Sequence, residues 1–180
     1  VIEAECSAAV LPPSAIDNCV GLINGYTSNP TEFNEQGTFY ISWTYKDGNG
    51  NFSYQEQTVI INDVTHPVIP VLENVVLLAC QTIPTPPIAE DNCAGLITGQ
   101  TSTEFPIRVP GMHTVVWTFD DGNGNIATAN QNVQVEIPNV PGQYLNLETC
   151  TMTPCPPGTY CPGATTEPIP CPAGKYQNLE

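Results

Sequence analysis

Hydrophobic and polar residues alternate along two stretches of the chain, 39–45 and 113–119. A period of two predicts a β-strand with one buried face, because successive side chains of a strand point to opposite sides of the sheet. The residues expected to face a core are Phe39, Ile41, Trp43 and Tyr45 in the first strand, and His113, Val115, Trp117 and Phe119 in the second.

Both strands run into the same five residues, Asp-Gly-Asn-Gly-Asn, at 47–51 and 121–125. Glycine and asparagine tolerate the left-handed backbone of tight turns, so each stretch predicts a β-hairpin. The core-facing residues expected on the second strands are Val59 and Ile61 in one hairpin, and Val133 and Val135 in the other.

The second strand of the first hairpin changes phase. Phe52 and Tyr54 have the opposite parity to Val59 and Ile61, so we expect a bulge or strand break between residues 55 and 58. No stretch of the chain has a helical period, and turn residues recur throughout. This pattern predicts an all-β fold, with short strands packed as a sandwich.

The two hairpins belong to a longer internal repeat. Residues 6–51 align without a gap on residues 80–125, at an offset of 74, and 21 of the 46 aligned positions are identical. We interpret the repeat as two copies of one domain. The predicted modules are residues 1–64, which begin inside the first strand of copy 1, residues 65–138, and a cysteine-rich segment of residues 139–180 that follows a proline-flanked linker.

Eight cysteines predict disulfides in an oxidising compartment. Each copy holds one pair thirteen residues apart, so the simplest pairing is Cys6 with Cys19 and Cys80 with Cys93, each contributing on the order of 3 kcal/mol. Zinc binding is disfavoured because neither copy offers four ligands. The remaining cysteines, which allow three pairings among themselves, are Cys150, Cys155, Cys161 and Cys171.

Acidic residues dominate the charge of the chain. Eighteen of them stand against three basic residues, Lys46, Arg108 and Lys175, for a formal net charge of -15. Nucleic acid is therefore excluded as a partner, because phosphates require clustered Lys and Arg. Such acidity is typical either of divalent-cation binding or of a solvated, self-repelling surface, and we favour the second interpretation.

The sequence predicts an extracellular or cell-surface location without membrane insertion. Its longest apolar stretch, 75–80, is far shorter than the roughly 20 residues that cross a bilayer. The first residues lack the basic patch and apolar core of a signal peptide. We expect either that export signals were removed during maturation or that the chain is an internal segment of a longer protein.

Several motifs of the repeat resemble those of the HYR, or hyalin repeat, family. They are the Asp-Asn-Cys triplets at 17–19 and 91–93, their companions Cys6 and Cys80, the aromatic strands running into the Asp-Gly-Asn-Gly-Asn turns, and the junction Asp63-Val-Thr-His-Pro67. The resemblance implies two tandem immunoglobulin-like β-sandwiches of the kind found in extracellular adhesive proteins.

The third segment contains a different repeat. Its two copies are Cys155-Pro-Pro-Gly-Thr-Tyr160 and Cys171-Pro-Ala-Gly-Lys-Tyr176. They resemble the ephrin-receptor-like, or GCC2/GCC3, cysteine-rich repeat, which implies a small disulfide-rich C-terminal module. Such repeats occur beside HYR-like modules in very long surface proteins, including the giant adhesins of gliding Bacteroidetes.

The turn residues are the candidate calcium ligands, because they space oxygen atoms at alternate positions. No bidentate glutamate follows as in an EF-hand loop, and a tight turn explains the same residues, so we favour a turn and predict no cofactor. The candidate metal ligands are Asp47, Asn49, Asn51, Asp121, Asn123 and Asn125.

Other candidate sites have structural alternatives that we prefer. Trp43 and Trp117 could stack on sugars, but their alternation places them in the core. His66 and His113 lack the spacing of a metal site or catalytic triad. Asn51 begins an N-glycosylation sequon, but it is also the last turn residue, and its counterpart Asn125 lacks the hydroxyl two positions on.

The predicted function is that of a non-catalytic spacer or stalk segment of a long surface adhesin or extracellular filament, because no catalytic motif is present. Its expected partners are neighbouring modules of the same chain. One alternative is a module that binds a glycan or protein through aromatic residues of copy 1, Tyr26, Tyr40 and Phe33. The other is a filament subunit that assembles laterally.

Overall fold

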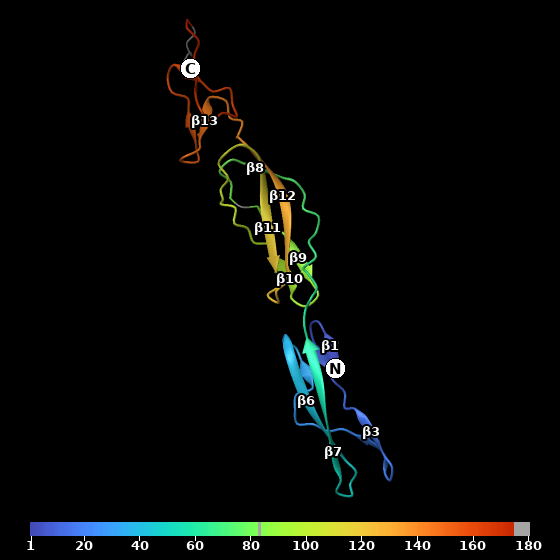
Figure 1. The fold of residues 1–180 in the computed structure, drawn as a ribbon. Coiled ribbons are helices and arrows are strands. Elements are labelled where there is room, and N and C mark those ends of the chain that lie inside the picture. The colour runs from blue at the N-terminus through green and yellow to red at the C-terminus, as the bar shows by residue number, and fades with distance from the viewer. Residues whose placement is uncertain (83, 175–180) are drawn as a thin grey trace. The chain divides into compact units, whose positions relative to one another are not determined.

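The structure, a computed structural model, describes residues 1–82 and 84–174. Within these residues the chain forms sixteen β-strands and no helix. The ribbon accordingly contains arrows and no coils (Figure 1), so the predicted all-β fold is confirmed. None of the described residues lies in a helix that could cross a lipid bilayer. Lys175 and Tyr176, from the second copy of the cysteine-rich repeat, lie outside the described residues.

The chain forms two compact units, each assembled from separate stretches. Unit 1 consists of Val1–Val68, Glu90–Ile97 and Asp120–Ile126. Unit 2 consists of Ile69–Ala89, Thr98–Phe119 and Ala127–Glu180. The two turn regions of copy 2, around Cys93 and around Asn123, are therefore part of the unit that contains copy 1. The module boundaries at 64 and 138 stay predictions.

A three-stranded sheet forms the larger layer of unit 1, with β7 between β1 and β6 (Figure 1). β1 pairs with β7 in parallel, whereas β6 and β7 form the predicted antiparallel hairpin. Two short ladders, β2 with β5 and β3 with β4, form the other layer. The bounds of these strands are β1 (Ile2–Ala4), β2 (Ala8–Ala9), β3 (Ser14–Asp17), β4 (Gly21–Asn24), β5 (Glu32–Phe33), β6 (Gly37–Lys46) and β7 (Phe52–Ile61).

The core of unit 1 lies between these layers. The alternating residues of β6 face it as predicted, and Val59 and Ile61 of β7 face it from the neighbouring strand. Ala8, Ala15, Ile23 and Phe33 close it from the short ladders. The fully buried side chains Ile41, Trp43, Val59 and Ile61 mark its centre. Each of these large side chains contributes about 1.5–3 kcal/mol by leaving water.

The expected bulge in β7 is wrong. β6 and β7 pair in one unbroken register, from Gly37 opposite Ile61 to Lys46 opposite Phe52. Phe52 and Tyr54 simply lie on the exposed face of the strand. The opposite face carries two glutamines, whose side-chain oxygens accept hydrogen bonds. Trp43 Nε1 donates to Gln57 and Tyr45 Oη donates to Gln55.

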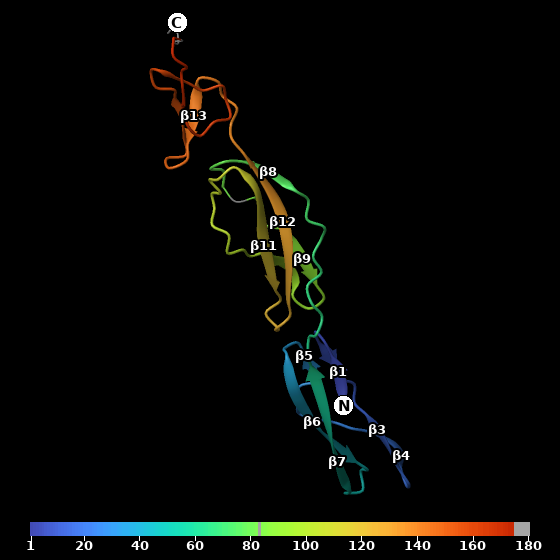
Figure 2. The ribbon, with the colours of Figure 1, turned by 45° about the horizontal axis from the view of Figure 1, so that its top comes forward.

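The strands of copy 2 recur at the 74-residue offset of the sequence repeat. β12 lies between β11 and β8 in a second three-stranded sheet (Figure 2), and β9 pairs with β10. The buried residues of this sheet include Val115, Trp117, Phe119, Val133 and Val135, as predicted. The strand bounds are β8 (Val75–Leu78), β9 (Ile88–Asp91), β10 (Gly95–Thr98), β11 (Gly111–Asp120) and β12 (Ile126–Glu136).

The third segment contributes two small antiparallel ladders to unit 2. β13 (Gln143–Asn146) pairs with β14 (Thr151–Pro154), and β15 (Thr159–Tyr160) pairs with β16 (Ile169–Pro170). Leu145 is its buried aliphatic side chain. The segment is attached to the rest of unit 2 by a disulfide between Cys80 and Cys150, and a second disulfide joins Cys155 to Cys161.

The predicted thirteen-residue disulfides are wrong. Cys6 pairs with Cys93 and Cys80 with Cys150, whereas Cys19 is a free, exposed thiol. The reason is the length of β7. Cys6 follows β1, which reaches the Ile61 end of β7, whereas the Cys19 turn lies with Asp17 beside the Phe52 end. Ten residues of strand separate these ends by about 30 Å, and a disulfide requires α-carbons within about 7 Å.

The prediction for the last four cysteines is also corrected. We expected Cys150, Cys155, Cys161 and Cys171 to pair among themselves, but Cys150 pairs with Cys80 and Cys171 is a free thiol. The turn after β13 brings the α-carbon of Cys150 to 5.6 Å from that of Cys80. Only the bond between Cys155 and Cys161 closes within the segment.

Candidate functional site

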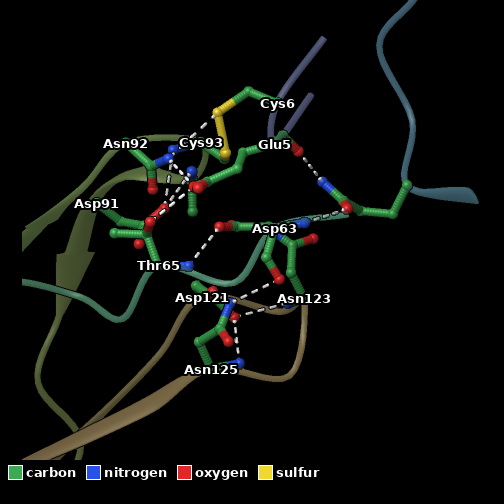
Figure 3. Close-up of a disulfide and its surroundings, with 12 residues drawn as sticks. Glu5, Cys6, Asp63, Thr65, Asp91, Asn92, Cys93, Asp121, Asn123 and Asn125 are labelled. Atoms are coloured by element: carbon green, nitrogen blue, oxygen red, sulfur yellow. Dashed lines mark hydrogen bonds between the residues drawn. A yellow bond between two sulfur atoms is a disulfide. The ribbon is translucent and has the colours of Figure 1, made fainter. Parts of the chain in front are cut away.

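Four carboxylates gather around the Cys6–Cys93 disulfide in unit 1 (Figure 3). Glu5 precedes Cys6 after β1, and Asp63 follows β7 by two residues. Asp91 ends β9, and Asp121 opens the turn after β11. Each therefore stands at the end of a strand, and residues far apart in sequence meet at one place because the strand ends meet there.

Asp91 is fixed by the Asp-Asn-Cys turn. Its Oδ1 accepts the backbone N–H groups of Cys93 at 2.9 Å and Ala94 at 2.8 Å. Such a turn, in which an aspartate binds the backbone two residues on, explains the Asp of the triplet. The same bonds occur in copy 1, where Asp17 Oδ1 accepts the N–H groups of Cys19 and Val20 at 2.8 and 3.0 Å.

Asp121 is fixed in the same manner by the Asp-Gly-Asn-Gly-Asn turn. Its Oδ1 accepts the backbone N–H groups of Asn123 at 2.7 Å and Asn125 at 3.0 Å, and its Oδ2 accepts the side-chain amide of Asn125 at 2.7 Å. Burial raises the pKa of the Asp121 carboxyl, but the hydrogen bonds from Asn125, Asn123 and Gly124 outweigh burial, so its pKa lies below the ordinary value.

Asp63 joins these turns to the end of β7. Its Oδ1 accepts the backbone N–H of Thr65 at 3.1 Å, and its Oδ2 accepts the side-chain amide of Asn123 at 2.9 Å. Asn125 also donates to the backbone oxygen of Asp63 at 3.3 Å. Asp63 is thus linked to the turn of Asp121 by two asparagine side chains.

Glu5 closes the cluster from the side of β1. Its Oε2 accepts hydrogen bonds from Thr65 Oγ1 at 2.6 Å and from Asn92 Nδ2 at 2.7 Å. Gln36 Nε2 donates to the backbone oxygen of Glu5, and Gln36 Oε1 accepts the backbone N–H of Asp63. These bonds position Glu5 and Asp63 on neighbouring strand ends.

The carboxylates of Asp63, Asp91 and Asp121 offer oxygens within 4.8 Å of one another. The three residues are buried, at 4%, 5% and 9% exposure. Two ionised carboxylates at this separation repel by about 3–4 kcal/mol at an effective dielectric constant of about 20. Asp91 Oδ2 is inaccessible to solvent and has no hydrogen-bond partner. The cluster therefore combines buried negative charge with an unsatisfied acceptor.

The donor atoms of this cluster are oxygens. A second group of ligand-type side chains brings Cys93 near Glu5 and Asp63, but the sulfur of Cys93 is bonded to Cys6 and is not a thiolate. An all-oxygen set of carboxylates suits a hard divalent cation. The arrangement offers cation binding as its chemistry.

The six predicted metal candidates lie at two different places in unit 1. Asp121, Asn123 and Asn125 lie in the cluster with Asp63. Their counterparts in copy 1 form a turn at another place in unit 1, where Asp47 Oδ1 accepts the backbone N–H groups of Asn49 and Asn51. Gly48 and Gly50 have φ of 80° and 101°, so the preferred turn interpretation explains this copy.

Glu5, Asp63 and Asp91 were not predicted as site residues. Their signal in the sequence was indirect, because Asp91 belongs to the Asp-Asn-Cys triplet and Asp63 opens the junction that resembles the HYR family. Neither motif reveals that Asp63 and Asp91 lie close together. Their proximity depends on the pairing of Cys6 with Cys93.

The aromatic candidates differ in how far they are buried. Trp43 and Trp117 are buried, so the preferred core interpretation is confirmed. Phe33 is not an exposed aromatic, because it is 7% exposed and packs on Phe39 with ring centroids 4.7 Å apart. Tyr26 and Tyr40 are 53% and 60% exposed.

Asn51 and the two histidines are placed at the surface or close to it. The side-chain amide of Asn51 donates to Asp47 Oδ2, so its amide nitrogen is engaged in the turn. His66 is exposed beyond the end of β7. His113 lies within hydrogen-bonding distance of the backbone oxygen of Val109, at 2.7 Å. Glycosylation of Asn51 would require this turn contact to break.

Comparison with known proteins links the chain to hyalin. No family model matches the chain. It is 30% identical to hyalin of Strongylocentrotus purpuratus over 146 residues, which cover 72% of this chain and 12% of hyalin. The chain therefore matches only about an eighth of the length of that relative. The match supports a hyalin-like module, in line with the resemblance of its motifs to hyalin repeats.

Proposed function

We propose that this chain is a non-catalytic spacer segment of an extracellular adhesion protein, in which cross-linked β-modules carry tension. Similarity to hyalin supports an adhesion-type module. Three disulfides support an oxidising, extracellular compartment. The match to a small part of a much longer relative supports a place within a longer array, whose neighbouring modules are the proposed partners.

One observation carries the proposal, namely that two long-range disulfides overlap in the sequence. Cys6 to Cys93 closes a separation of 87 residues, and Cys80 to Cys150 closes one of 70. Cys80 lies inside the first loop, and Cys93 lies inside the second. A pulling force applied to the two ends therefore follows the covalent cross-links instead of the whole backbone.

The overlap limits how far the chain can extend. The shortest covalent path crosses from Cys6 to Cys93, returns to Cys80, crosses to Cys150 and passes through the bond between Cys155 and Cys161. This path contains roughly 45 residues and spans about 16 nm at about 3.5 Å per residue, whereas the full chain would span about 60 nm. A spacer built in this way keeps its reach under load.

Single-molecule pulling through the two termini tests this mechanism. The oxidised protein is expected to lengthen to at most about 16 nm, and to approach about 60 nm after reduction. A Cys19→Ser variant is the matched control, because it removes a free thiol and leaves every bond of the load path in place. Extension toward 60 nm without reductant would remove the mechanical support for a spacer.

A ligand-binding module is the second candidate, and the exposed tyrosines of copy 1 favour it. Tyr26 and Tyr40 present aromatic surface where copy 2 carries Gln100 and Thr114. Both rings suit stacking on a sugar or docking of a protein. Glycan-array binding that is lost in Tyr26→Gln and Tyr40→Thr variants would favour this candidate over a passive spacer.

A further inference from the structure

We propose that Asp63, Asp91 and Asp121 together bind one calcium ion. This inference is independent of the spacer proposal, because it rests on the geometry of unit 1 alone. The site joins the segment after β7 to the Asp-Asn-Cys turn and to the Asp-Gly-Asn-Gly-Asn turn of copy 2, with Glu5 beside it (Figure 3).

The spacing of the carboxylates fits calcium. Calcium binds oxygen at about 2.3–2.6 Å, so two oxygens on opposite sides of one ion lie about 4.6–5.2 Å apart. Oxygens of Asp63, Asp91 and Asp121 lie within 4.8 Å of one another. Carboxylate oxygens gathered this closely can share one ion of the size of calcium.

Asp91 has a buried carboxylate oxygen without a hydrogen-bond partner, which supports a cation site independently of the spacing. The side chain is 5% exposed, its Oδ1 is occupied by two backbone N–H groups, and its Oδ2 has no partner. A buried carboxylate oxygen is costly unless a donor or a cation faces it. A bound cation in the cluster supplies that partner and removes the mutual repulsion of the three aspartates.

The described lysine and arginine side chains do not neutralise the three aspartates. Lys46 and Arg108 are the basic residues among those described. Lys46 lies over the ring of Phe52, with its Nζ 5.3 Å from the centroid. Arg108 donates in unit 2 to the backbone oxygens of Leu147 and Glu148. The partners of the cluster are instead neutral amides, a hydroxyl and backbone N–H groups.

The donor set favours calcium over other divalent ions. Zinc and other softer metals prefer nitrogen or thiolate ligands, and the nearby Cys93 sulfur is held in a disulfide. Magnesium demands an octahedron at about 2.0–2.1 Å and usually retains several waters. Three carboxylates held in place by their turns suit the larger and more flexible oxygen shell of calcium.

The turns pre-organise the site. One oxygen of each aspartate is held by backbone N–H groups, from Thr65 for Asp63, from Cys93 and Ala94 for Asp91, and from Asn123 and Asn125 for Asp121. Little side-chain freedom remains to be lost on binding. The ion would tie together three segments that are distant in sequence, and calcium would thereby stabilise unit 1.

Calorimetric titration of the oxidised, chelator-treated protein with calcium chloride tests the site. We expect one ion per chain with a dissociation constant of about 10⁻⁴–10⁻³ M, the range of extracellular modules. Asp63→Asn and Asp91→Asn should weaken binding by tenfold or more. Asparagine keeps an oxygen for the turn at either position, so the fold should persist, which circular dichroism in EDTA checks.

Copy 1 provides matched controls. Asp17→Asn and Asp47→Asn change the equivalent turn aspartates, which make the same backbone contacts. Within residues 1–82 and 84–174, neither belongs to a group of three potential metal ligands. These variants should bind calcium within twofold of the parent protein. An additional readout is the melting temperature of the parent protein, which calcium should raise and equimolar magnesium should raise less.

Three results would overturn the proposal. The first is the absence of binding heat and of any melting shift at 10 mM calcium, on the order of tenfold above the weakest expected constant. The second is equal loss of affinity in the copy-1 controls and the cluster variants. The third is unchanged binding in both cluster variants, which would place the ion elsewhere. Each result leaves the pulling experiment, and hence the spacer proposal, unaffected.

Discussion

The indole N–H of Trp43 donates a hydrogen bond to Oε1 of Gln57 at 2.8 Å, across the β6–β7 hairpin. The relationship recurs at the repeat offset, because Trp117 Nε1 donates to Gln131 Oε1 at 2.9 Å. A glutamine on a core-facing strand position interrupts the hydrophobic alternation. The same glutamine accepts a hydrogen bond from the indole N–H, which is the one polar group of the fully buried tryptophan side chain.

Gln57→Ala should therefore destabilise the protein. The substitution leaves the Trp43 indole N–H buried without an acceptor, which costs about 1–3 kcal/mol of unfolding free energy. Urea unfolding followed by tryptophan fluorescence measures the change. Glu56→Ala is the matched control on the exposed face of the same strand, and it should change stability by less than about 0.5 kcal/mol. Equal effects of the two substitutions would contradict a role for the hydrogen bond.

Loss of the Cys6–Cys93 disulfide should be costlier than loss of the shortest one. On the loop-entropy model, the 87-residue separation contributes roughly 4–5 kcal/mol and the 6-residue separation of Cys155 and Cys161 contributes roughly 2 kcal/mol. Paired substitution to alanine at each bond, with stability measured by urea unfolding, gives the comparison. The order would be reversed if the long-range pairing did not form in the protein.

Local features of the fold could be predicted from the sequence because their cause is local. Alternation located the buried faces of β6 and β11, and the Gly-Asn-rich stretches located the hairpin turns. The phase change at Phe52 was misread as a bulge, because periodicity cannot distinguish a break in a strand from an inward glutamine with a buried hydrogen-bond partner.

Long-range features could not be predicted because they depend on where strand ends meet. The spacing of Cys6 and Cys19 suggested a short loop, yet the ten residues of β7 separate their positions. The same limitation applies to the acidic cluster. Asp63 and Asp121 are 58 residues apart in sequence, and only the fold joins them through Asn123. The turn of Asp121 could be predicted, but its buried partners could not.

Cys19 should be the thiol that reacts fastest with an alkylating reagent. It is exposed and free, whereas Cys171 is half-buried and the other six cysteines form disulfides. Brief treatment of the native protein with iodoacetamide, followed by mass spectrometry, should show the first added group on Cys19. Digestion after glutamate is suitable, because three basic residues give trypsin few sites.

The same non-reducing digest tests the connectivity. A linked pair of peptides containing Cys6 and Cys93 is expected, and so is a pair containing Cys80 and Cys150. Recovery of Cys6 linked to Cys19 would contradict the structure. It would also restore the pairing that sequence spacing alone suggests, so the two connectivities are distinguished by one measurement.

Asp47 should titrate below an ordinary aspartate, and Asn51 should be the main reason. The side-chain hydrogen bond from Asn51 lowers the pKa of the Asp47 carboxyl, with further lowering by the backbone N–H groups of Asn49, Asn51 and Gly50 that outweighs the opposing effect of burial. Because the folded pKa is lower than the unfolded one, the stabilisation by this turn is complete above the ordinary pKa of 3.8. It is lost as the pH falls through the folded value.

Asn51→Ala should move the pKa of Asp47 up toward 3.8, since it removes the largest lowering contribution. A pH titration of the Asp47 carboxyl carbon by NMR measures this shift. Asn49→Ala is the matched control, because Asn49 acts on Asp47 through its backbone N–H, which alanine retains. An equal rise in both variants would show that the whole turn, and not the Asn51 side chain, determines the acidity of Asp47.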